Sequence, residues 1–391
     1  MIPFLDLAAD FAEVESEARR RLDGVLARQQ FVLGPETGEL EATMRDRTGA
    51  AAAVAVSSGS DALSLALLAL GVGAGDAVLL PSFTFFATAG AVARAGAVPV
   101  FCDIEASSFL AEAGQMEAAI ERDFRDEGGV LRHRASGARL KALLPVHLYG
   151  RACAMDAFVV LAARVGAVVI EDAAQAIGCY FSGEPVGLWG DVGCFSFYPT
   201  KNLGGAGDGG LLLCRDADLG ARLASLRTHG GVHGSYEHRE IGINARMGEM
   251  EAAVLNAKLA HLDAWTARRV ELAALYDECL ASAASRGVVT LAPPAPAGSH
   301  VYHQYVVRIA RGRDEVMVRL ESEGIAARVF YPLPLHLQPC FRSLGGREGD
   351  LPVSEAAARE VLCLPLFPSL TDGDVERVAT ALETAVEASS R

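Results

Sequence analysis

Hydrophobic and polar positions near the N-terminus repeat with the period of a helix. In residues 11–30 the apolar positions have the spacing of one face of an α-helix. This apolar stripe consists of Phe11, Val14, Leu22, Val25 and Leu26. The pair Gly34-Pro35 then indicates a turn before a second helix.

From residue 51 the pattern changes to short β-rich runs separated by helical stretches. The runs occupy residues 51–56, 77–82, 97–103, 141–149, 167–173, 193–199 and 209–214. The last two runs resemble paired strands around a glycine-rich turn. Polar residues 121–140 are interpreted as an exposed loop inserted between elements. Regular alternation of strands and helices predicts an α/β fold.

The C-terminal third of the chain is expected to form a second, smaller unit. A long helical pattern starts at about residue 248, and the proline-rich stretch 292–300 interrupts the chain after it. A further α/β pattern follows and continues to the C-terminus. We therefore expect a large domain over residues 1–250 and a smaller α/β domain over 251–391, with the long helix as the link.

Composition and charge narrow the class of protein. The chain has 391 residues, of which 51% are hydrophobic and 21% charged, as in soluble globular enzymes. A formal net charge of −14 argues against a nucleic-acid partner. The eight cysteines are scattered singly, so neither a disulfide scaffold nor a metal site is expected. With no signal-like start and no membrane-length apolar run, we expect a cytoplasmic protein.

The segment Ser58-Gly59-Ser60-Asp61 lies between a predicted strand and a predicted helix. Backbone N–H groups at the start of a helix suit a phosphate, and a glycine lets the phosphate approach closely. The alternative is that Ser60 or Asp61 only caps the helix, and the local sequence favours the cap.

A carboxylate, Asp172, ends the apolar run 167–173. Ligands of α/β enzymes bind at the carboxyl ends of the strands. A carboxylate there would keep a pyridine nitrogen protonated, and the protonated ring can act as an electron sink. A helix-capping role for Asp172 is about equally compatible with the local sequence.

A lysine, Lys201, follows the predicted strand at 193–199 and precedes a glycine-rich stretch. A lysine in such a restrained loop can form a Schiff base with a cofactor aldehyde, although most lysines are solvated surface charges. The GxGxxG spacing at Gly205, Gly207 and Gly210 is not a dinucleotide fingerprint, because a strand and not a helix follows it. A fourth segment, 242–247, could be only a turn and cap before the long helix.

Together these segments resemble the DegT/DnrJ/EryC1/StrS family of sugar aminotransferases. Thirteen fragments occur in the expected order over nearly the whole chain: IPFLDL, FVLGPE, SSGSDAL, LGVGAGDAV, PSFTFFAT, PVHLYG, EDAAQAIG, FSFYPTKNLG, GDGG, IGINARM, YHQYVVR, YPLPLHLQP and LPLFP. The resemblance implies a fold-type I architecture, in which a mostly parallel seven-stranded sheet flanked by helices forms the large domain. It also implies pyridoxal 5′-phosphate as the cofactor.

The resemblance assigns the residues around the cofactor ring. Lys201 forms an imine with the cofactor and acts as general base and acid. Asp172 pairs with the pyridinium nitrogen, and Gln175 reaches the ring hydroxyl. Phe85 stacks on one face of the ring, and Ala174 packs near the other.

The resemblance also implies a homodimer with shared active sites. Gly59, Ser60 and Ser196 bind the cofactor phosphate, and Asn244 is offered to that phosphate by the partner subunit. An isolated monomer would then be inactive.

The expected substrates are an amino donor, glutamate, and a nucleotide-linked sugar with a 3-keto or 4-keto group. Arg246 is the first candidate for binding an anionic substrate group, with Tyr331 and His336 after it. A surface or interface role is at least as compatible with these three residues. The sequence departs from the family pattern at Phe330, where related sequences often carry histidine before Tyr-Pro.

Two alternatives remain from other functional classes. A sugar dehydratase of this fold would carry histidine at position 201, and the chain has lysine there. A non-catalytic regulatory protein retaining the fold would be expected to lose Lys201 or Asp172, and both are present.

Overall fold

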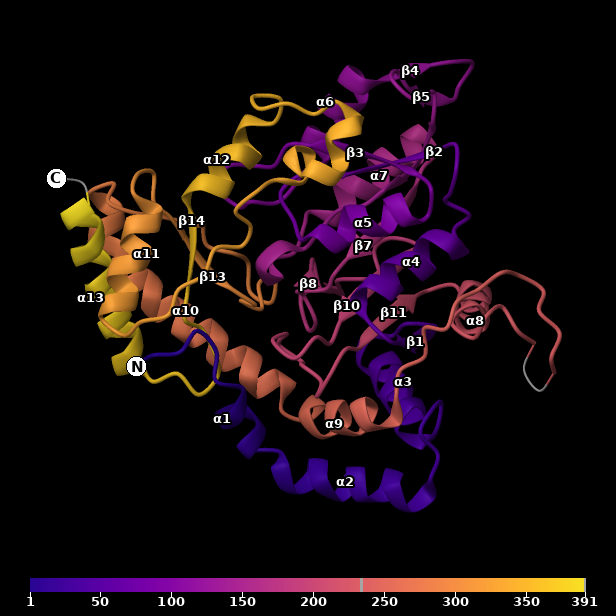
Figure 1. Cartoon of the computed structure of the whole chain (residues 1–391), viewed down its shortest axis with the longest axis horizontal. Coiled ribbons are helices and arrows are strands. Elements are labelled where there is room, and N and C mark those ends of the chain that lie inside the picture. The colour runs from indigo at the N-terminus through magenta and orange to yellow at the C-terminus, as the bar shows by residue number, and fades with distance from the viewer. Residues whose placement is uncertain (233–234, 390–391) are drawn as a thin grey trace.

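The computed structural model describes residues 1–232 and 235–389, and most of its strands form one mixed sheet. The strands of its main row lie in the order β1–β11–β10–β7–β6–β2–β3 (Figure 1). From β10 to β3 all neighbours are parallel, whereas β11 is antiparallel to both β1 and β10. The strands are β1 (Ala52–Val56), β11 (Gly210–Cys214), β10 (Val192–Ser196), β7 (Val168–Asp172), β6 (Arg139–Leu143), β2 (Asp76–Pro81) and β3 (Val98–Cys102).

Alternate residues of the sheet pack into different cores, as the two-residue period of a strand requires. On β1, Val54 packs with helices α4 and α8, whereas Ala53 and Ala55 pack with helices α3 and α9. The sheet is therefore covered by helices on both sides. The covering helices are α3 (Pro35–Thr48), α4 (Gly59–Ala69), α5 (Phe86–Arg94), α6 (Ala113–Asp123), α7 (Met155–Val165), α8 (Ala217–Leu226) and α9 (Glu249–Leu259).

The polar segment 121–140 is not only a loop, and that prediction was wrong. It contains the end of α6 and a hairpin of β4 (Phe124–Asp126) and β5 (Leu131–His133), which adds to β6 and makes the sheet nine-stranded. The buried Phe124 anchors the hairpin to the core. Each of these strands has only three residues, which is too short for an alternation of hydrophobic and polar positions to be recognised in the sequence.

The predicted N-terminal helix is broken into α1 (Leu7–Ala12) and α2 (Glu15–Arg28). Val14 lies at the break, is 1% exposed, and packs beside Ala257 and Trp265. The Trp265 indole donates to a carboxylate oxygen of Glu13 at 2.9 Å. Contacts with distant helices therefore set the break. The long helical pattern from residue 248 likewise divides into α9 and α10 (Leu262–Ser285).

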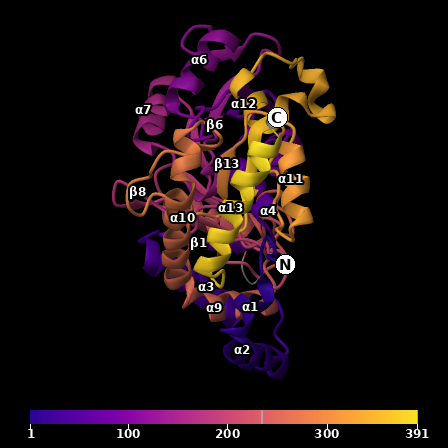
Figure 2. The ribbon, with the colours of Figure 1, turned by 90° about the vertical axis from the view of Figure 1, so that its left-hand side faces the viewer.

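A second core lies around a three-stranded antiparallel sheet of β12 (Thr290–Leu291), β13 (Tyr305–Arg308) and β14 (Val361–Leu364). Helices α10, α11 (Arg313–Ser322) and α13 (Asp372–Ser389) stand side by side over it (Figure 2). The remaining elements are α12 (Pro352–Glu360), β8 (Tyr180–Phe181), β9 (Glu184–Pro185), and the short 3₁₀ turns Leu148–Gly150, Leu335–Leu337 and Pro339–Leu344.

Long helix α10 contributes side chains to both cores. Leu262 at its start packs with the large sheet, while Leu272 and Tyr276 lie in the second core, which also includes Ile2 from the N-terminus. A boundary near residue 250 stays a prediction. None of the helices in residues 1–232 and 235–389 is long and apolar enough to cross a membrane.

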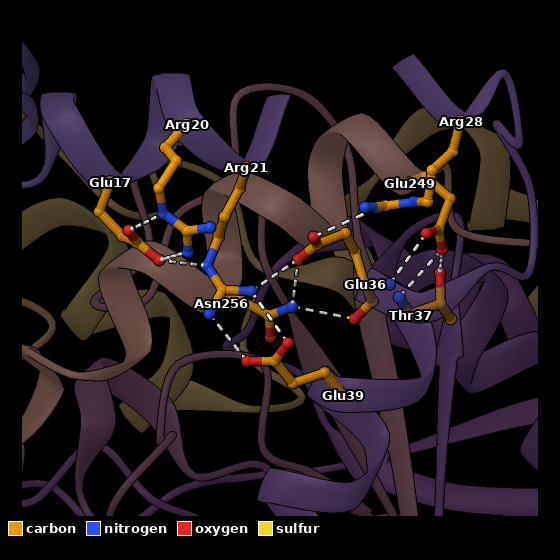
Figure 3. Close-up of polar contacts among 9 residues, drawn as sticks. All are labelled: Glu17, Arg20, Arg21, Arg28, Glu36, Thr37, Glu39, Glu249 and Asn256. Carbon is orange, nitrogen blue, oxygen red and sulfur yellow. Dashed lines mark hydrogen bonds and ion pairs between the residues drawn. The ribbon is translucent and has the colours of Figure 1, made fainter. Parts of the chain in front are cut away.

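The start of helix α3 is capped by a carboxylate from far along the chain. Glu249, which is fully buried, accepts hydrogen bonds from the backbone N–H groups of Gly34, Glu36 and Thr37, each at 2.9 Å. The Thr37 hydroxyl donates to it as well (Figure 3). A negative charge at a helix N-terminus is stabilised by the unpaired N–H groups there. Glu249 therefore fastens α3 to the start of α9.

Substituting Glu249 by alanine should lower the free energy of unfolding by about 2–4 kcal/mol, because three backbone donors lose a charged acceptor in a buried place. Urea unfolding followed by circular dichroism measures this. The matched control is Glu15→Ala, which removes an exposed carboxylate paired with Arg19 and should change stability by less than about 0.5 kcal/mol. Equal effects of the two substitutions would contradict the role given to Glu249.

Candidate active site

Two adjacent carboxylates end strand β7 and point to opposite sides of the sheet. Glu171 is fully buried and accepts from the backbone N–H groups of Gly187, Trp189 and Gly190 at 2.7–2.8 Å. His147 lies 3.1 Å from it through Nε2. Since successive side chains of a strand alternate, fixing Glu171 behind the sheet directs Asp172 to the other side.

Asp172 is 5% exposed, and its carboxylate accepts two hydrogen bonds. The Thr88 hydroxyl donates to Oδ2 at 2.8 Å, and the backbone N–H of Ala174 donates to Oδ1 at 3.2 Å. Burial raises the pKa of Asp172, while the Thr88 hydrogen bond and the positive charge of Lys201 oppose that rise. The site therefore contains a desolvated carboxylate that a nearby cation would stabilise.

Lys201 supplies that cation from a tight loop after β10. The loop is closed by the backbone bonds Lys201 N–H to Tyr198 C=O and Gly205 N–H to Phe197 C=O, both 2.8 Å. Burial lowers the pKa of Lys201 to about 8, and the charge of Asp172 acts in the opposite direction. A lysine with such a pKa is largely neutral slightly above pH 8, as a nucleophilic amine needs to be.

A close approach between two segments forms the predicted phosphate site. The backbone at Gly59 lies so near Ser196 that a Cβ at Gly59 would stand 2.7 Å from that of Ser196. Gly59 and Ser60 begin helix α4, where Ser58 is the cap residue. Among the described residues, no hydrogen bond engages the backbone N–H groups of Gly59 or Ser60. Free amides beside a serine hydroxyl suit an oxyanion.

Aromatic and amide side chains gather around Gln175, three residues after Asp172. The Phe85 ring is 53% exposed and its centroid is 5.8 Å from that of Tyr331. Gln175 donates from Nε2 to the Tyr331 hydroxyl at 3.1 Å. The same amide accepts through Oε1 from the backbone N–H of Tyr149 at 2.6 Å. Tyr149 thus fixes which end of the Gln175 amide faces the site.

The structure brings most of the predicted residues to the carboxyl ends of β7 and β10, where α/β folds bind ligands. Asn244 and Arg246 lie in the segment before α9, where Arg246 donates from Nε to Asn244 Oδ1 at 2.9 Å. Asn244 itself is exposed. His336 lies elsewhere: it is 3% exposed, and its ring nitrogens contact Ser82 at 2.7 Å and Glu355 at 3.2 Å.

Two residues of this site were missed by sequence reasoning. Thr88 had a weak signal, because it is a polar residue in an apolar helix, three positions after Phe85. Tyr149 acts through its backbone N–H, so its side-chain type gave no signal. Its φ of +59° is unusual for a residue other than glycine and reflects the tight turn that presents this N–H.

These residues fit pyridoxal 5′-phosphate. The fit rests on unpaired amides with a close glycine for the phosphate, a buried carboxylate for a protonated ring nitrogen, and a lysine amine of lowered pKa. In the described parts of the chain, no cluster of histidine, cysteine or acidic residues could hold a metal ion.

Comparison with known proteins agrees with this geometry. Residues 12–383 match the DegT/DnrJ/EryC1/StrS aminotransferase family. The chain belongs to this family. The match covers both cores, and members of the family are pyridoxal-phosphate-dependent sugar aminotransferases. The resemblance noted in the sequence is confirmed, and so are the fold-type I architecture, the cofactor and the enzyme class.

Several relatives match nearly the whole chain. A Geobacillus stearothermophilus protein named a pleiotropic regulatory protein is 44% identical over 97% of this chain and 98% of its own. The UDP-N-acetyl-3-dehydro-α-D-glucosamine 3-aminotransferase of Acidithiobacillus ferrooxidans is 41% identical over 97% of both chains. The dTDP-3-amino-3,4,6-trideoxy-α-D-glucose transaminase of Streptomyces venezuelae is 40% identical over 99% of this chain and 96% of its own.

A solved structure supports the cofactor assignment. The crystal structure of NtdA from Bacillus subtilis, which contains the bound cofactor PMP, superposes with a TM-score of 0.88. It is 28% identical, and the alignment covers 99% of this chain and 85% of that one. The two proteins therefore share the same fold over the whole of this chain.

The pKa of Lys201 gives a pH-dependent prediction for the cofactor-free protein. Covalent attachment of pyridoxal phosphate to Lys201 requires the neutral amine, so its rate should rise with pH with a midpoint at about pH 8 and level off at higher pH. Asp172→Asn removes the negative charge that raises this pKa, so the midpoint should move to lower pH. Stopped-flow absorbance measures both midpoints.

The control for this measurement is Asp216→Asn, at the exposed cap of α8, which should leave the midpoint unchanged. A wild-type midpoint at the ordinary lysine value, about 10.4, would show that burial does not tune Lys201.

Proposed function

We propose that the chain transfers an amino group from glutamate to the keto group at carbon three of a nucleotide-linked sugar. The choice of carbon three rests on the names of two relatives, which are 41% and 40% identical to this chain and whose names place the amino group at carbon three. Both names also specify a sugar that is linked to a nucleotide. Neither name gives the amino donor, so glutamate remains the expectation from the family resemblance.

The cofactor supplies an electron sink when bound, and residues of the chain hold it and move protons. Lys201 would hold the cofactor until the amine of the donor displaces it. Its freed amine, whose pKa burial lowers, would then take the proton from Cα of the amino donor and, in the second half of the reaction, would give a proton to the sugar carbon. The Asp172 carboxylate keeps the ring nitrogen protonated. The hydrogen bond from Thr88 favours the ionised form of Asp172 and so opposes the rise in pKa that burial causes.

The other predicted residues orient the ring. We assign the phosphate to Gly59, Ser60 and Ser196. Gly59 lies close to Ser196, and the backbone N–H groups of Gly59 and Ser60 have no hydrogen-bond partner among the described residues. We assign Phe85 to one face of the ring and Ala174 to the other.

The ring hydroxyl is assigned to Gln175. One hydrogen of its amide Nε2 is directed to Tyr331, and the second is left for the ring hydroxyl. Tyr331 therefore acts on the ring through Gln175. His336 stabilises the loop in which it lies through its contacts with Ser82 and Glu355.

The proposal includes a homodimer in which each subunit completes the partner's site. Asn244 is exposed, and its carboxamide is held by Arg246 in a segment next to the rigid cap formed by Glu249. We assign Asn244 to the cofactor phosphate of the second copy and Arg246 to an anionic group of the substrate. Because the net charge of the chain is −14, such local cations are needed to bind an anionic sugar nucleotide.

The substrate assignment is tested by incubating the holoenzyme with glutamate and either a UDP- or dTDP-linked 3-keto sugar or its 4-keto isomer. Mass spectrometry and NMR of the product should show amination at carbon three, with formation of 2-oxoglutarate. The 4-keto isomer should react at least about tenfold more slowly, since misplacing the reacting carbon by one position removes it from the Lys201 amine. Faster amination of the 4-keto isomer would overturn the choice of carbon.

Shared sites are tested by mixing two inactive variants, Lys201→Ala and Asn244→Ala, and letting the subunits exchange. In a heterodimer one site combines wild-type Lys201 with wild-type Asn244 from the partner, and random pairing restores about a quarter of the sites. If both residues instead serve the site of their own chain, mixing restores no activity. Mixing Lys201→Ala with Asp172→Asn is the control, because both residues lie in one chain's site and should not complement.

A further inference from the structure

Residues 301–304, just before strand β13, lie against the turn at Tyr149 and Gly150. The Val301 N–H donates to the carbonyl of Gly150 at 2.8 Å, and the Gln304 N–H donates to Tyr149 at 3.3 Å. Contact is so close that a Cβ at Gly150 would stand 2.9 Å from the backbone nitrogen of His303. The stretch therefore joins the middle strand of the small sheet rigidly to the turn that orients Gln175.

The same stretch holds the residue that follows Lys201. Asn202 is 7% exposed and donates from Nδ2 to the carbonyl of Val301 at 2.9 Å. Its Oδ1 lies 3.2 Å from Nδ1 of His303, which is 5% exposed. An amide oxygen can only accept, so Nδ1 of His303 carries the hydrogen.

The His303 ring is held in its neutral form. Its Nε2 lies 3.5 Å from the amide nitrogen of Gln304, which can only donate, so Nε2 is the acceptor. Burial first, and then the positive charges of Lys201 and Arg269, lower the pKa of His303 well below its ordinary value. The hydrogen bond to Asn202 is therefore maintained throughout the pH range in which Lys201 titrates.

The other end of the lysine loop is held by a second buried cation. Lys258 on α9 is 7% exposed and donates from Nζ to the carbonyl of Gly204 at 2.8 Å. A Cβ at Gly204 would lie 2.1 Å from the carbonyl oxygen of Pro199, so the loop cannot relax there. Among the described residues, Nζ of Lys201 has no hydrogen bond. The backbone on the C-terminal side of Lys201 is thus fixed while its amine stays free.

We propose that His303 is a positioning residue for Lys201: by donating to Asn202 it fixes the lysine loop to the chain segment that enters the small domain. The position of strand β13 thereby helps to determine the position of the Lys201 amine. This inference rests on the proposed role of Lys201.

The test compares His303→Leu, which has similar volume but no donor, with His303→Asn, whose Nδ2 replaces the Nδ1 donor. His300→Leu is the matched control: His300 is 9% exposed, directly precedes residues 301–304 and stacks on Tyr302, whose backbone N–H donates to its Nδ1 at 3.0 Å, but it has no hydrogen bond to Asn202. Two quantities are measured: hydrogen exchange of residues 198–205 in the cofactor-free protein, and the rate of covalent attachment of pyridoxal phosphate to Lys201.

We expect His303→Leu to speed exchange of residues 198–205 and to slow attachment about tenfold, because Asn202 Oδ1 is left buried without a donor. His303→Asn should restore attachment to within about twofold of wild type, and His300→Leu should leave it unchanged. Asn202→Leu should reproduce the slow attachment of His303→Leu if the latter fails to fold.

Wild-type attachment and exchange in a folded His303→Leu protein would overturn the positioning role. Equal slowing by His300→Leu would overturn it too, since the effect would then come from the packing of the segment. A wild-type protein that attaches no cofactor at Lys201 would instead remove the proposed role of Lys201 on which the inference rests.

Discussion

The site depends on one buried carboxylate that has no part in the chemistry. Glu171 accepts three backbone hydrogen bonds and contacts His147, so its charge is stabilised inside the protein and the end of β7 is held in place. Asp172, the next residue, must then point to the opposite side. Its position beside Thr88 follows from this alternation, and Asp172 caps no helix, because turns and not a helix follow it.

The electrostatic character of the site comes from two desolvated charges of opposite sign. Burial raises the pKa of Asp172 and lowers that of Lys201, and each charge opposes the shift of the other. A bound cofactor would place a ring nitrogen whose protonated form the Asp172 carboxylate stabilises, and it would bind the Lys201 amine covalently. Two desolvated charges of opposite sign are consistent with the membership of this chain in a pyridoxal-phosphate-dependent family.

Sequence reasoning predicted the parts of the molecule that local pattern determines. The strands of the main row, the glycine at the start of α4, Asp172 at a strand end and Lys201 in a restrained loop all have local signals. The thirteen fragments gave the family, which the comparison confirmed.

The features that sequence reasoning did not predict depend on contacts between distant segments. Glu249 caps a helix 212 residues away, Val14 breaks a helix by packing against Trp265, and Tyr149 acts through its backbone. His336 was a candidate for binding an anionic substrate group, which stays a prediction, and its hydrogen bonds to Ser82 and Glu355 had no signal in the sequence. The hydrophobic and polar pattern along a chain does not predict contacts between distant residues, because these form only when the helices and strands pack together.

The most direct test of the account is the absorbance spectrum of purified wild-type protein loaded with pyridoxal phosphate, beside Lys201→Ala, before and after excess glutamate. The account predicts a band from cofactor bound to Lys201 in the wild type, its conversion by glutamate to the pyridoxamine phosphate spectrum, and no Lys201-linked band in the variant. A wild-type protein that binds the cofactor through Lys201 yet is unchanged by glutamate and every other amino acid would contradict transamination as its reaction.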